Sequence, residues 1–509
     1  MVSLSVKKNE AQQSKLEPIK SFFLTYWGTL LVGFCFCITR LRYITYPLGL
    51  VHRQVVKEGY RSYEAITSSR EFSFVIYEQP IFVILLEILY NITGKSPDNL
   101  VIWARIMGFI FSAISLIIIY KISEMAFGDI AAKFASFLYS LSPYGIFLNL
   151  GIQRETLMWL FGLSAIFFLL KYLETENAKY IIFNLAFSIL AILTKLTGFY
   201  FLFTSIISLV LFYSGSPFKA RITLRKRFFA LFLISTSIIL FSLLFAIFSV
   251  EGDSFSALRN TIVHRPEALF DTNFWGTAVV FAMIHIPITT VLLGGIGFFL
   301  ALLPFKKESL VIILWFLFTG MEFVFYGYGA IIHEYYILYL LPPLVVLAGK
   351  PLLLLYEVSL SQMTEINVFP SKFASPGLIL ILLLCSSFVP LFNYTGETKI
   401  VDASKPFYED VRSIGLFLND YDIQGREIAI IYWKENYTWW KSHLTLMRTY
   451  IAKPNIDVIY TYNISEIIYW RKFKAIIGWR DDLNQVKGIL ALNFANYTFY
   501  SQNYPFKGI

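Results

Sequence analysis

The sequence predicts a polytopic α-helical membrane protein with a small α/β domain at its C-terminal end. Of its 509 residues, 57% are hydrophobic and only 15% are charged, which lies outside the range of soluble globular proteins. About eleven apolar runs are long enough to cross a bilayer as helices. After about residue 393 the composition changes to short alternating runs, which predict a separate domain.

The predicted spans are runs of roughly 20 mostly apolar residues separated by polar breaks. They lie at about 21–39, 101–122, 130–149, 156–172, 179–195, 199–214, 228–249, 276–302, 310–328, 334–356 and 375–392. The first run is too long for a signal peptide and lacks a small-residue cleavage site, so we expect a retained span. A further run at 80–90 is too short to span and carries Glu87, which predicts a helix at the membrane interface.

The basic residues of the short loops predict the orientation, because they favour the cytoplasmic side. Lysine and arginine residues precede the first span and recur in the loops at 215–227 and 306–307. These segments face the same side if the N-terminus is cytoplasmic. The predicted parts of this multi-pass cell-membrane protein are a cytoplasmic tail at 1–20, a transmembrane domain at 21–392 with a first outer loop at 40–100, and an extracytoplasmic domain at 393–509.

The C-terminal domain alternates two kinds of pattern. Helix-like pieces at 406–418 and 437–450 lie among strand-like runs such as EIAIIYW at 427–433, DVIYTY and KAIIGW. This alternation predicts a small α/β domain.

Composition also excludes several classes of site. The three cysteines all lie in apolar runs, which argues against a disulfide framework and a cysteine metal site. The net charge of +9 is scattered over loops beside the membrane, so we expect no nucleic-acid partner. Few cysteines together with many isoleucine, lysine and tyrosine residues point to an archaeal source.

Ionisable residues gather at the predicted outer surface, where they are costly unless they are paired or hydrated. Four separate segments supply them. They are His52, Lys57, Glu58, Glu64 and Glu78 in the first outer loop, Arg154 and Glu155 before the fourth span, Lys195 at the end of the fifth span, and His333, Glu334 and Tyr336 at the start of the tenth span.

Each of these residues alone has an ordinary structural explanation. Lys195 can extend to the interface as lysines at helix ends do, and Glu155 can stabilise the first turn of the next helix. A lone histidine such as His333 is more often an interfacial residue than a catalyst. It is the convergence of the four segments that predicts a functional site.

The stretch HEYYILYLLPPLVVLAG, residues 333–349, combines this polar cluster with two adjacent prolines. Pro342 and Pro343 each lack a backbone N–H donor, so we expect a kink inside the tenth span. A kink would widen the helix bundle and let a lipid headgroup enter from the side.

This stretch resembles the His-Tyr and Pro-Pro segment of membrane glycosyltransferases of the GT-C class, in particular the dolichyl-phosphate-mannose protein mannosyltransferase and aminoarabinose transferase group. Three further stretches are similar in order and setting, YEQPIFVILLEILYNITG, WARIMGFIFSAISLIIIYKISEMAFG and LAILTKLTGFYFL. The resemblance covers roughly residues 20–350 and implies a GT-C-like transmembrane domain.

The resemblance also implies a reaction, the inverting transfer of a sugar from a polyprenyl (dolichyl) phosphate to an acceptor hydroxyl at the outer face. The acceptor would be a glycan, a lipid or a protein. The resemblance implies that an acidic residue of the first outer loop is the base. Glu58 matches the second member of the family's Asp-Glu pair, with Lys57 where the aspartate usually stands, and Glu155 falls where a second-loop aspartate is usual.

The chemistry of this reaction requires the residue types at the predicted site. A carboxylate must take the proton of the attacking hydroxyl, and cations must stabilise the leaving phosphate. Lys195, Arg154, His333 and Tyr336 are the expected phosphate-binding residues. The carboxylates also suit a divalent metal, although no ligand spacing requires one.

Two alternatives remain open from the sequence. An oligosaccharyltransferase usually carries a Trp-Trp-Asp-Tyr-Gly motif, whereas here Trp439 and Trp440 are followed by Lys441. A flippase or transporter of lipid-linked sugars would be expected to carry charges at the middle of the membrane, whereas here they cluster at one face.

Overall fold

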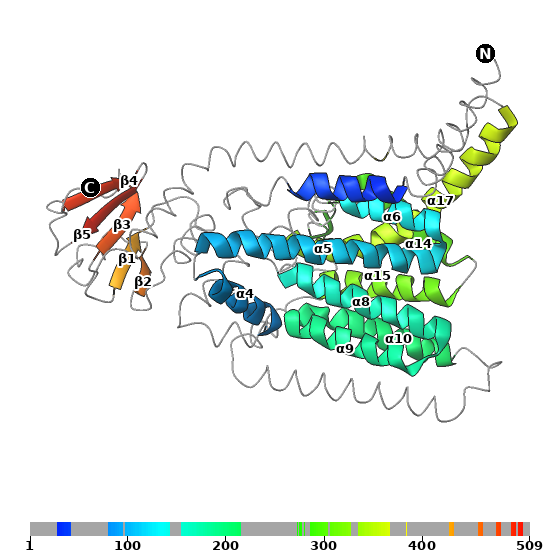
Figure 1. The fold of residues 1–509 in the computed structure, drawn as a ribbon, viewed down its shortest axis with the longest axis horizontal. Coiled ribbons are helices and arrows are strands. Elements are labelled where there is room, and N and C mark those ends of the chain that lie inside the picture. Colours follow the sequence, from blue (N-terminus) through cyan, green and yellow to red (C-terminus); the bar gives the residue numbers. More distant parts are fainter. Residues whose placement is uncertain are drawn as a thin grey trace, which may run out of the picture.

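The computed structural model describes most of a helical bundle and five strands. The described residues are 28–41, 80–94, 97–142, 154–214, 286–303, 306–326, 334–366, 427–431, 457–461, 475–479, 490–494 and 497–501, with the isolated residues 272, 274–276, 279 and 383. In the bundle, the long helices run alternately in opposite directions (Figure 1).

The helices follow most of the predicted spans. After the helix Gly28–Leu41, the structure has α4 (Pro80–Ile92), α5 (Pro97–Phe127), α6 (Asp129–Leu141), α8 (Arg154–Thr175), α9 (Ala178–Thr194), η2 (Leu196–Gly198), α10 (Phe199–Ser214), α14 (Ile288–Ala301), α15 (Lys307–Tyr326), η4 (Glu334–Leu340) and α17 (Leu341–Ile366). The predicted span 228–249 and all but one residue of 375–392 lie outside the described residues, so the total of eleven stays a prediction.

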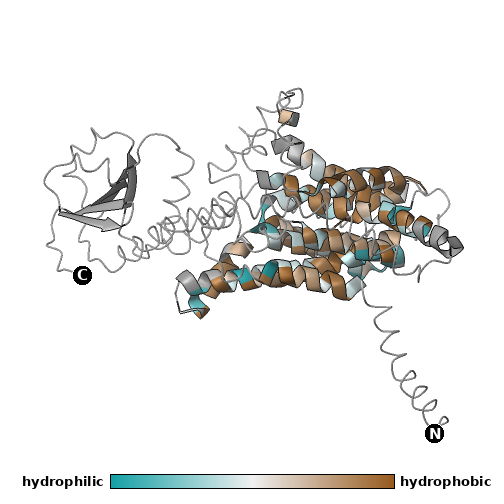
Figure 2. Cartoon of the chain, turned by 90° about the horizontal axis from the view of Figure 1, so that it is seen from above, coloured by the Kyte–Doolittle hydropathy of each residue, from teal (hydrophilic) through white to brown (hydrophobic). Residues whose placement is uncertain are grey.

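Length and hydropathy support a membrane location. Among the described residues, three helical segments are long and apolar enough to cross a bilayer, Ile102–Phe127, Arg154–Thr175 and Tyr336–Val358. Figure 2 shows that the bundle is mostly apolar along the helices. The short helix expected at 80–90 is α4, which begins at Pro80 and packs against α5.

The core of the bundle is centred on α8, which packs against α9 and α5. Phe168 of α8 stacks on Phe187 of α9, with ring centroids 5.5 Å apart. Asn184 of α9 donates hydrogen bonds to the carbonyl oxygen of Ala165 at 2.8 Å and to the hydroxyl of Ser205 at 2.9 Å. This buried amide therefore links α8, α9 and α10, as polar side chains often do between membrane helices.

Glycine allows α14 to approach α17 very closely. A Cβ atom at Gly297 would lie 2.0 Å from the carbonyl oxygen of Leu347. At Gly295, on another face of α14, a Cβ atom would meet nothing within 4 Å among the described residues. The two helices therefore touch along a line of small residues.

The two prolines of the tenth predicted span do not kink a helix interior, and that expectation was wrong. Residues Glu334–Leu340 form a 3₁₀ helix, and Pro342 and Pro343 are the second and third residues of α17. Proline is well tolerated in the first turn, because the N–H groups there have no partner within the helix. The proline inside α17 is Pro351.

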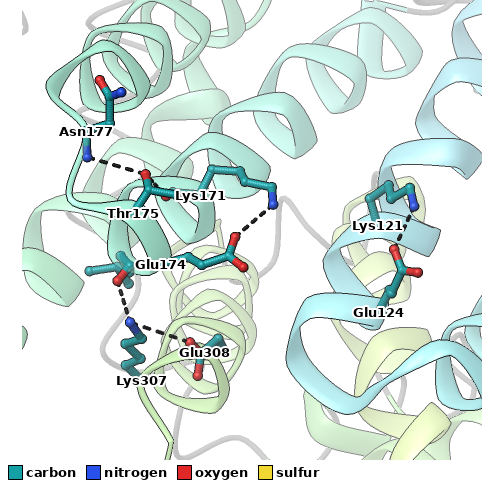
Figure 3. A network of polar contacts seen from close by, with 9 residues as sticks. Lys121, Glu124, Lys171, Glu174, Thr175, Asn177, Lys307 and Glu308 are labelled. Carbon is teal, nitrogen blue, oxygen red and sulfur yellow. Dashed lines mark hydrogen bonds and ion pairs between the residues drawn. The ribbon is translucent and has the colours of Figure 1, made fainter.

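The helix ends opposite the candidate site carry ion pairs (Figure 3). Lys171 bonds Glu174 at the end of α8, and Lys121 bonds Glu124 near the end of α5, each at 2.7 Å. Lys307, the first residue of α15, lies at the same end of the bundle. Its side chain caps the end of α8 by donating a hydrogen bond to the carbonyl oxygen of Leu173. The predicted topology places this end of the bundle in the cytoplasm.

The C-terminal strands form one mixed sheet. Its strands are β1 (Glu427–Ile431), β2 (Asp457–Thr461), β3 (Ala475–Trp479), β4 (Leu490–Phe494) and β5 (Tyr497–Ser501), in the order β2-β1-β3-β5-β4. β1 is parallel to β2 and β3, while β5 is antiparallel to β3 and β4.

The sheet confirms the three strand-like runs of the sequence. Parallel neighbours need crossover connections, which are usually helical. The helix-like pieces expected at 406–418 and 437–450 lie outside the described residues, so the α/β character of the domain stays a prediction. The same holds for its extracytoplasmic location and for the domain limits.

Candidate functional site

The site is built on the first turn of α8. Arg154 and Glu155 are its first two residues, and an acidic side chain is favourable there because the helix N-terminus carries partial positive charge. The Glu155 side chain is fully buried, and its Oε1 accepts a hydrogen bond from Nζ of Lys195. Glu155 thus stabilises its own helix start and also joins α8 to the end of α9.

Lys195 is held in place by a tight turn between α9 and α10. Its backbone N–H donates to the carbonyl oxygen of Ala191 at 3.0 Å and closes α9, and its own carbonyl accepts from the N–H of Gly198 at 2.8 Å. A Cβ atom at Gly198 would lie 2.6 Å from the carbonyl carbon of Ala191. Glycine is therefore required for the close return of the chain, which explains the glycine three residues after the lysine.

The Lys195 side chain is only 5% exposed, so it does not extend to an exposed position as the simpler explanation proposed. Its ammonium lies 4.8 Å from the ring centroid of Tyr336 and 5.4 Å from that of Tyr339. Residues three apart share a face in a 3₁₀ helix, which is why η4 presents both rings to the same cation. Cation–π contacts of this kind strengthen when they are shielded from water.

A second set of side chains surrounds the pair and was not predicted from the sequence. The hydroxyl of Tyr339 lies 3.5 Å from Glu155 Oε1 and 3.4 Å from Oγ1 of Thr197. The ring of Trp159, four residues after Glu155, meets that of Tyr339 edge on at 6.4 Å. The signal available in the sequence was their spacing from the predicted residues. Thr197 lies two residues after Lys195, Tyr339 three after Tyr336, and Trp159 four after Glu155.

Among the described residues, the cluster holds two cations, Arg154 and Lys195, and one carboxylate, Glu155. Nε of Arg154 lies 3.9 Å from Glu155 Oε1, so two cations approach one carboxylate oxygen. The other oxygen, Oε2, is buried and has no hydrogen-bond partner among the described residues. Two cations at one buried position are a chemistry that binds anionic groups, through charge-assisted hydrogen bonds.

The structure brings together four of the predicted site residues, Arg154, Glu155, Lys195 and Tyr336. Glu334, also predicted, is the first residue of η4. The other predicted site residues lie outside the described residues, so their convergence stays a prediction. They are His52, Lys57, Glu58, Glu64, Glu78 and His333. Within the described part of the chain, no three histidine, cysteine, aspartate or glutamate side chains gather as metal ligands do.

Comparison with known proteins gives a match to one family. Residues 78–245 match the model of the dolichyl-phosphate-mannose-protein mannosyltransferase family, and this range contains Arg154, Glu155 and Lys195. The resemblance found in the sequence is thereby confirmed for this third of the chain. No curated protein sequence matches the chain.

Solved structures extend the likeness to almost the whole chain. The oligosaccharyltransferase of Archaeoglobus fulgidus, tethered to an acceptor peptide, is 13% identical with a TM-score of 0.55, covering 90% of this chain and 70% of its own. ArnT from Cupriavidus metallidurans, bound to undecaprenyl phosphate, is 12% identical with a TM-score of 0.54, covering 94% and 98%. The chain has a GT-C glycosyltransferase fold. At such low identity, the likeness establishes the GT-C fold and leaves the reaction to be tested.

Proposed function

We propose that this chain transfers a sugar from a polyprenyl (dolichyl) phosphate to an acceptor hydroxyl at the outer face of the membrane, with inversion at the anomeric carbon. The observation that carries the proposal is the buried Glu155 and Lys195 pair beneath the rings of η4. Burying such a pair is costly, and functional sites are where such groups concentrate in membrane proteins. The pair lies in the range that matches a mannosyltransferase family.

Lys195 and Arg154 are proposed to bind the donor phosphate. When the sugar leaves, the lipid phosphate gains charge, and a preorganised cation stabilises that charge without rearrangement. An ammonium group has three N–H donors, so Lys195 can hold Glu155 and a phosphate oxygen at the same time. Tyr336 and His333 complete the proposed phosphate-binding set, His333 by its neighbouring position in the sequence.

Glu58 is proposed as the base that takes the proton from the acceptor hydroxyl. Glu155 is the second candidate for this role. Its Oε1 is engaged by Lys195 and Arg154, so only Oε2 has room for the proton of an acceptor. This arrangement suits Glu155 better as the group that fixes Lys195 than as the base.

The similar structures support a lipid-phosphate donor. The ArnT structure contains undecaprenyl phosphate, and a complex of the Archaeoglobus fulgidus enzyme AglB contains dolichol-phosphate together with an inhibitory peptide. Both neighbours therefore bind polyprenyl phosphates on the same fold. For this chain we propose a hexosyl donor on such a carrier.

An oligosaccharyltransferase reaction is the second candidate, because the fold is as similar to that enzyme as to ArnT. The two reactions differ in what they transfer and to what. A single sugar moves to a hydroxyl in the first, whereas an oligosaccharide moves to the side-chain amide of asparagine in the second. The lysine after Trp439 and Trp440 favours the first.

The experiment uses the full chain in detergent with a panel of radiolabelled polyprenyl-phosphate hexoses and membrane extract as acceptor. We expect label in the protein, lipid or glycan fraction, and loss of that transfer in Lys195→Met. The matched control is Lys121→Met, which removes a lysine at the opposite end of the bundle. No transfer from any donor would contradict the proposal, and transfer only from lipid-linked oligosaccharide to an asparagine peptide would establish the second candidate instead.

A further inference from the structure

Arg40 lies in the last described turn of the helix Gly28–Leu41, and its guanidinium is fully buried. One nitrogen, Nη1, donates to the carbonyl oxygen of Ser140 at 3.0 Å and lies 3.1 Å from Oγ1 of Thr39. The guanidinium carbon lies 4.0 Å from the ring centroid of Phe36 and 6.0 Å from that of Tyr139. A carbonyl, a hydroxyl and two aromatic faces therefore hold the cation in a fixed position.

Arg40 lacks a counter-ion within the described part of the chain. Its Nε and Nη2 are buried without a hydrogen-bond partner, and no ion pair of Arg40 with a described carboxylate is present. Lys195 differs in this respect, because Glu155 offsets its charge. A buried charge that nothing compensates is strongly unfavourable, so the environment of Arg40 is complete only when an anion is added.

A buried hydroxyl follows the backbone carbonyl that Arg40 contacts. Ser142, two residues beyond the carbonyl that Arg40 contacts, is buried, and its Oγ has no hydrogen-bond partner among the described residues. Ser142 also terminates α6, where its backbone N–H bonds the carbonyl oxygen of Tyr139. Two guanidinium donors and one hydroxyl donor thus remain available at one helix end.

The position of these donors indicates which anion they take. The helix α6 ends on the side of the bundle where α8 begins, opposite the ion pairs of Figure 3, and the last described turn of the helix Gly28–Leu41 lies on the same side (Figure 1). Helix ends lie at the level of lipid headgroups when the helices span a bilayer. The planar fork of arginine matches the oxygens of a phosphate, and it forms stronger hydrogen bonds with an anion than with a neutral group.

We propose that Arg40 and Ser142 form a binding site for the phosphate of a membrane-borne lipid. Nε and Nη2 of Arg40 donate to two phosphate oxygens, and Oγ of Ser142 donates to one. The phosphate replaces the missing counter-ion, and the lipid chain extends along the bundle. Binding at this site does not depend on the proposed sugar transfer, because no sugar takes part in it.

The test measures phosphate binding to the full chain in maltoside micelles, which contain no phosphate. Three probes are titrated separately, a polyprenyl monophosphate, phosphatidylglycerol and inorganic phosphate. Arg40→Met should weaken binding of the lipid probe by about tenfold or more, the worth of charge-assisted hydrogen bonds. The control Lys121→Met, which removes an exposed lysine at the other end of the bundle, should leave binding unchanged.

Two further variants separate binding from folding. Ser142→Ala removes a hydroxyl without a described partner, so the protein should fold and bind the lipid probe about threefold to tenfold more weakly. Arg40→Lys keeps the charge and loses the fork, and it should restore part of the affinity. Ligand-free Arg40→Met should unfold at the wild-type temperature or above it, because it removes an uncompensated buried charge.

The probes identify the source of the phosphate. The decisive quantity is the loss of affinity in Arg40→Met, since Lys195 and Arg154 are proposed to bind a polyprenyl phosphate as well. A larger loss for the polyprenyl probe assigns the Arg40 site to a lipid-linked carrier, and a larger loss for phosphatidylglycerol assigns it to a bulk membrane lipid. Binding of inorganic phosphate alone would overturn the lipid assignment. Unchanged lipid affinity in Arg40→Met and Ser142→Ala would overturn the site, and a less stable ligand-free Arg40→Met with unchanged affinity would show that a carboxylate of the chain is the partner.

Discussion

Lys195→Met would leave the Glu155 carboxylate buried, with Nε of Arg154 at 3.9 Å as the one cation beside it among the described residues and the neutral hydroxyl of Tyr339 at 3.5 Å. The distance to Arg154 is too long for a hydrogen bond, so Arg154 compensates only part of the charge. Glu155 is 0% exposed, and water cannot take the place of the lysine without opening the start of α8. We expect Lys195→Met to lower the free energy of unfolding by about 3 kcal/mol or more.

The reverse variant should cost less, because the ammonium keeps other contacts. Glu155→Gln leaves Lys195 beside the rings of Tyr336 and Tyr339, each of which attracts a cation by about 0.5 to 2 kcal/mol. We expect Glu155→Gln to cost about 2 kcal/mol. The double variant leaves neither charge of the pair and should cost about 1 kcal/mol, so the two residues should be coupled by roughly 4 kcal/mol.

The assay is a double-mutant cycle measured by reversible unfolding of the full chain in mixed micelles. The control cycle uses Lys171→Met and Glu174→Gln, an ion pair at the other end of α8 with side chains 32% and 53% exposed. An exposed pair three residues apart should be coupled by less than about 0.5 kcal/mol. Equal coupling in both cycles, or additive effects at Lys195 and Glu155, would refute the buried pair.

Three further outcomes follow from the fold and the proposed chemistry. Gly297→Ala should lower the free energy of unfolding by about 1 to 3 kcal/mol because the new Cβ meets the backbone of α17, whereas Gly295→Ala should not lower it, and equal effects would contradict the close contact. Glu58→Gln should slow sugar transfer by about 10²-fold with donor affinity little changed, and normal turnover would exclude Glu58 as the base. A cysteine in place of Thr445 should react with an impermeant reagent on intact cells, whereas one in place of Ile222 should not, and the reverse pattern would invert the predicted topology.

The helices were the most predictable part of the fold. Runs such as 199–214 coincide with an observed helix because an apolar stretch in a membrane has no alternative to internal hydrogen bonding. Helix ends were less predictable, since α5 begins at Pro97 and extends beyond its apolar run at both ends. The error at Pro342 arose because a span of 3₁₀ and α segments has the same hydropathy as a single helix.

The sequence predicted which charged residues lie at the same end of the bundle, but it did not predict which of them bond each other. Glu155 and Lys195 lie 40 residues apart, and only the alternation of helices predicts that they share one end of the bundle. Their bond depends on side-chain directions that hydropathy does not contain. Tyr339 and Trp159 were missed because buried aromatic residues around a site look the same in a sequence as those of an ordinary core.

The 3₁₀ form of η4 sets how many aromatic faces Lys195 meets. At three residues per turn, Tyr336 and Tyr339 lie on one line along the segment, and both rings reach the ammonium. In an α-helix the same two side chains would be about 60° apart around the axis, so one ring would turn away. The position of Leu341, where the 3₁₀ helix changes to an α-helix, therefore determines whether both tyrosine rings reach Lys195. If the α-helix began one turn earlier, the ammonium would contact one ring instead of two.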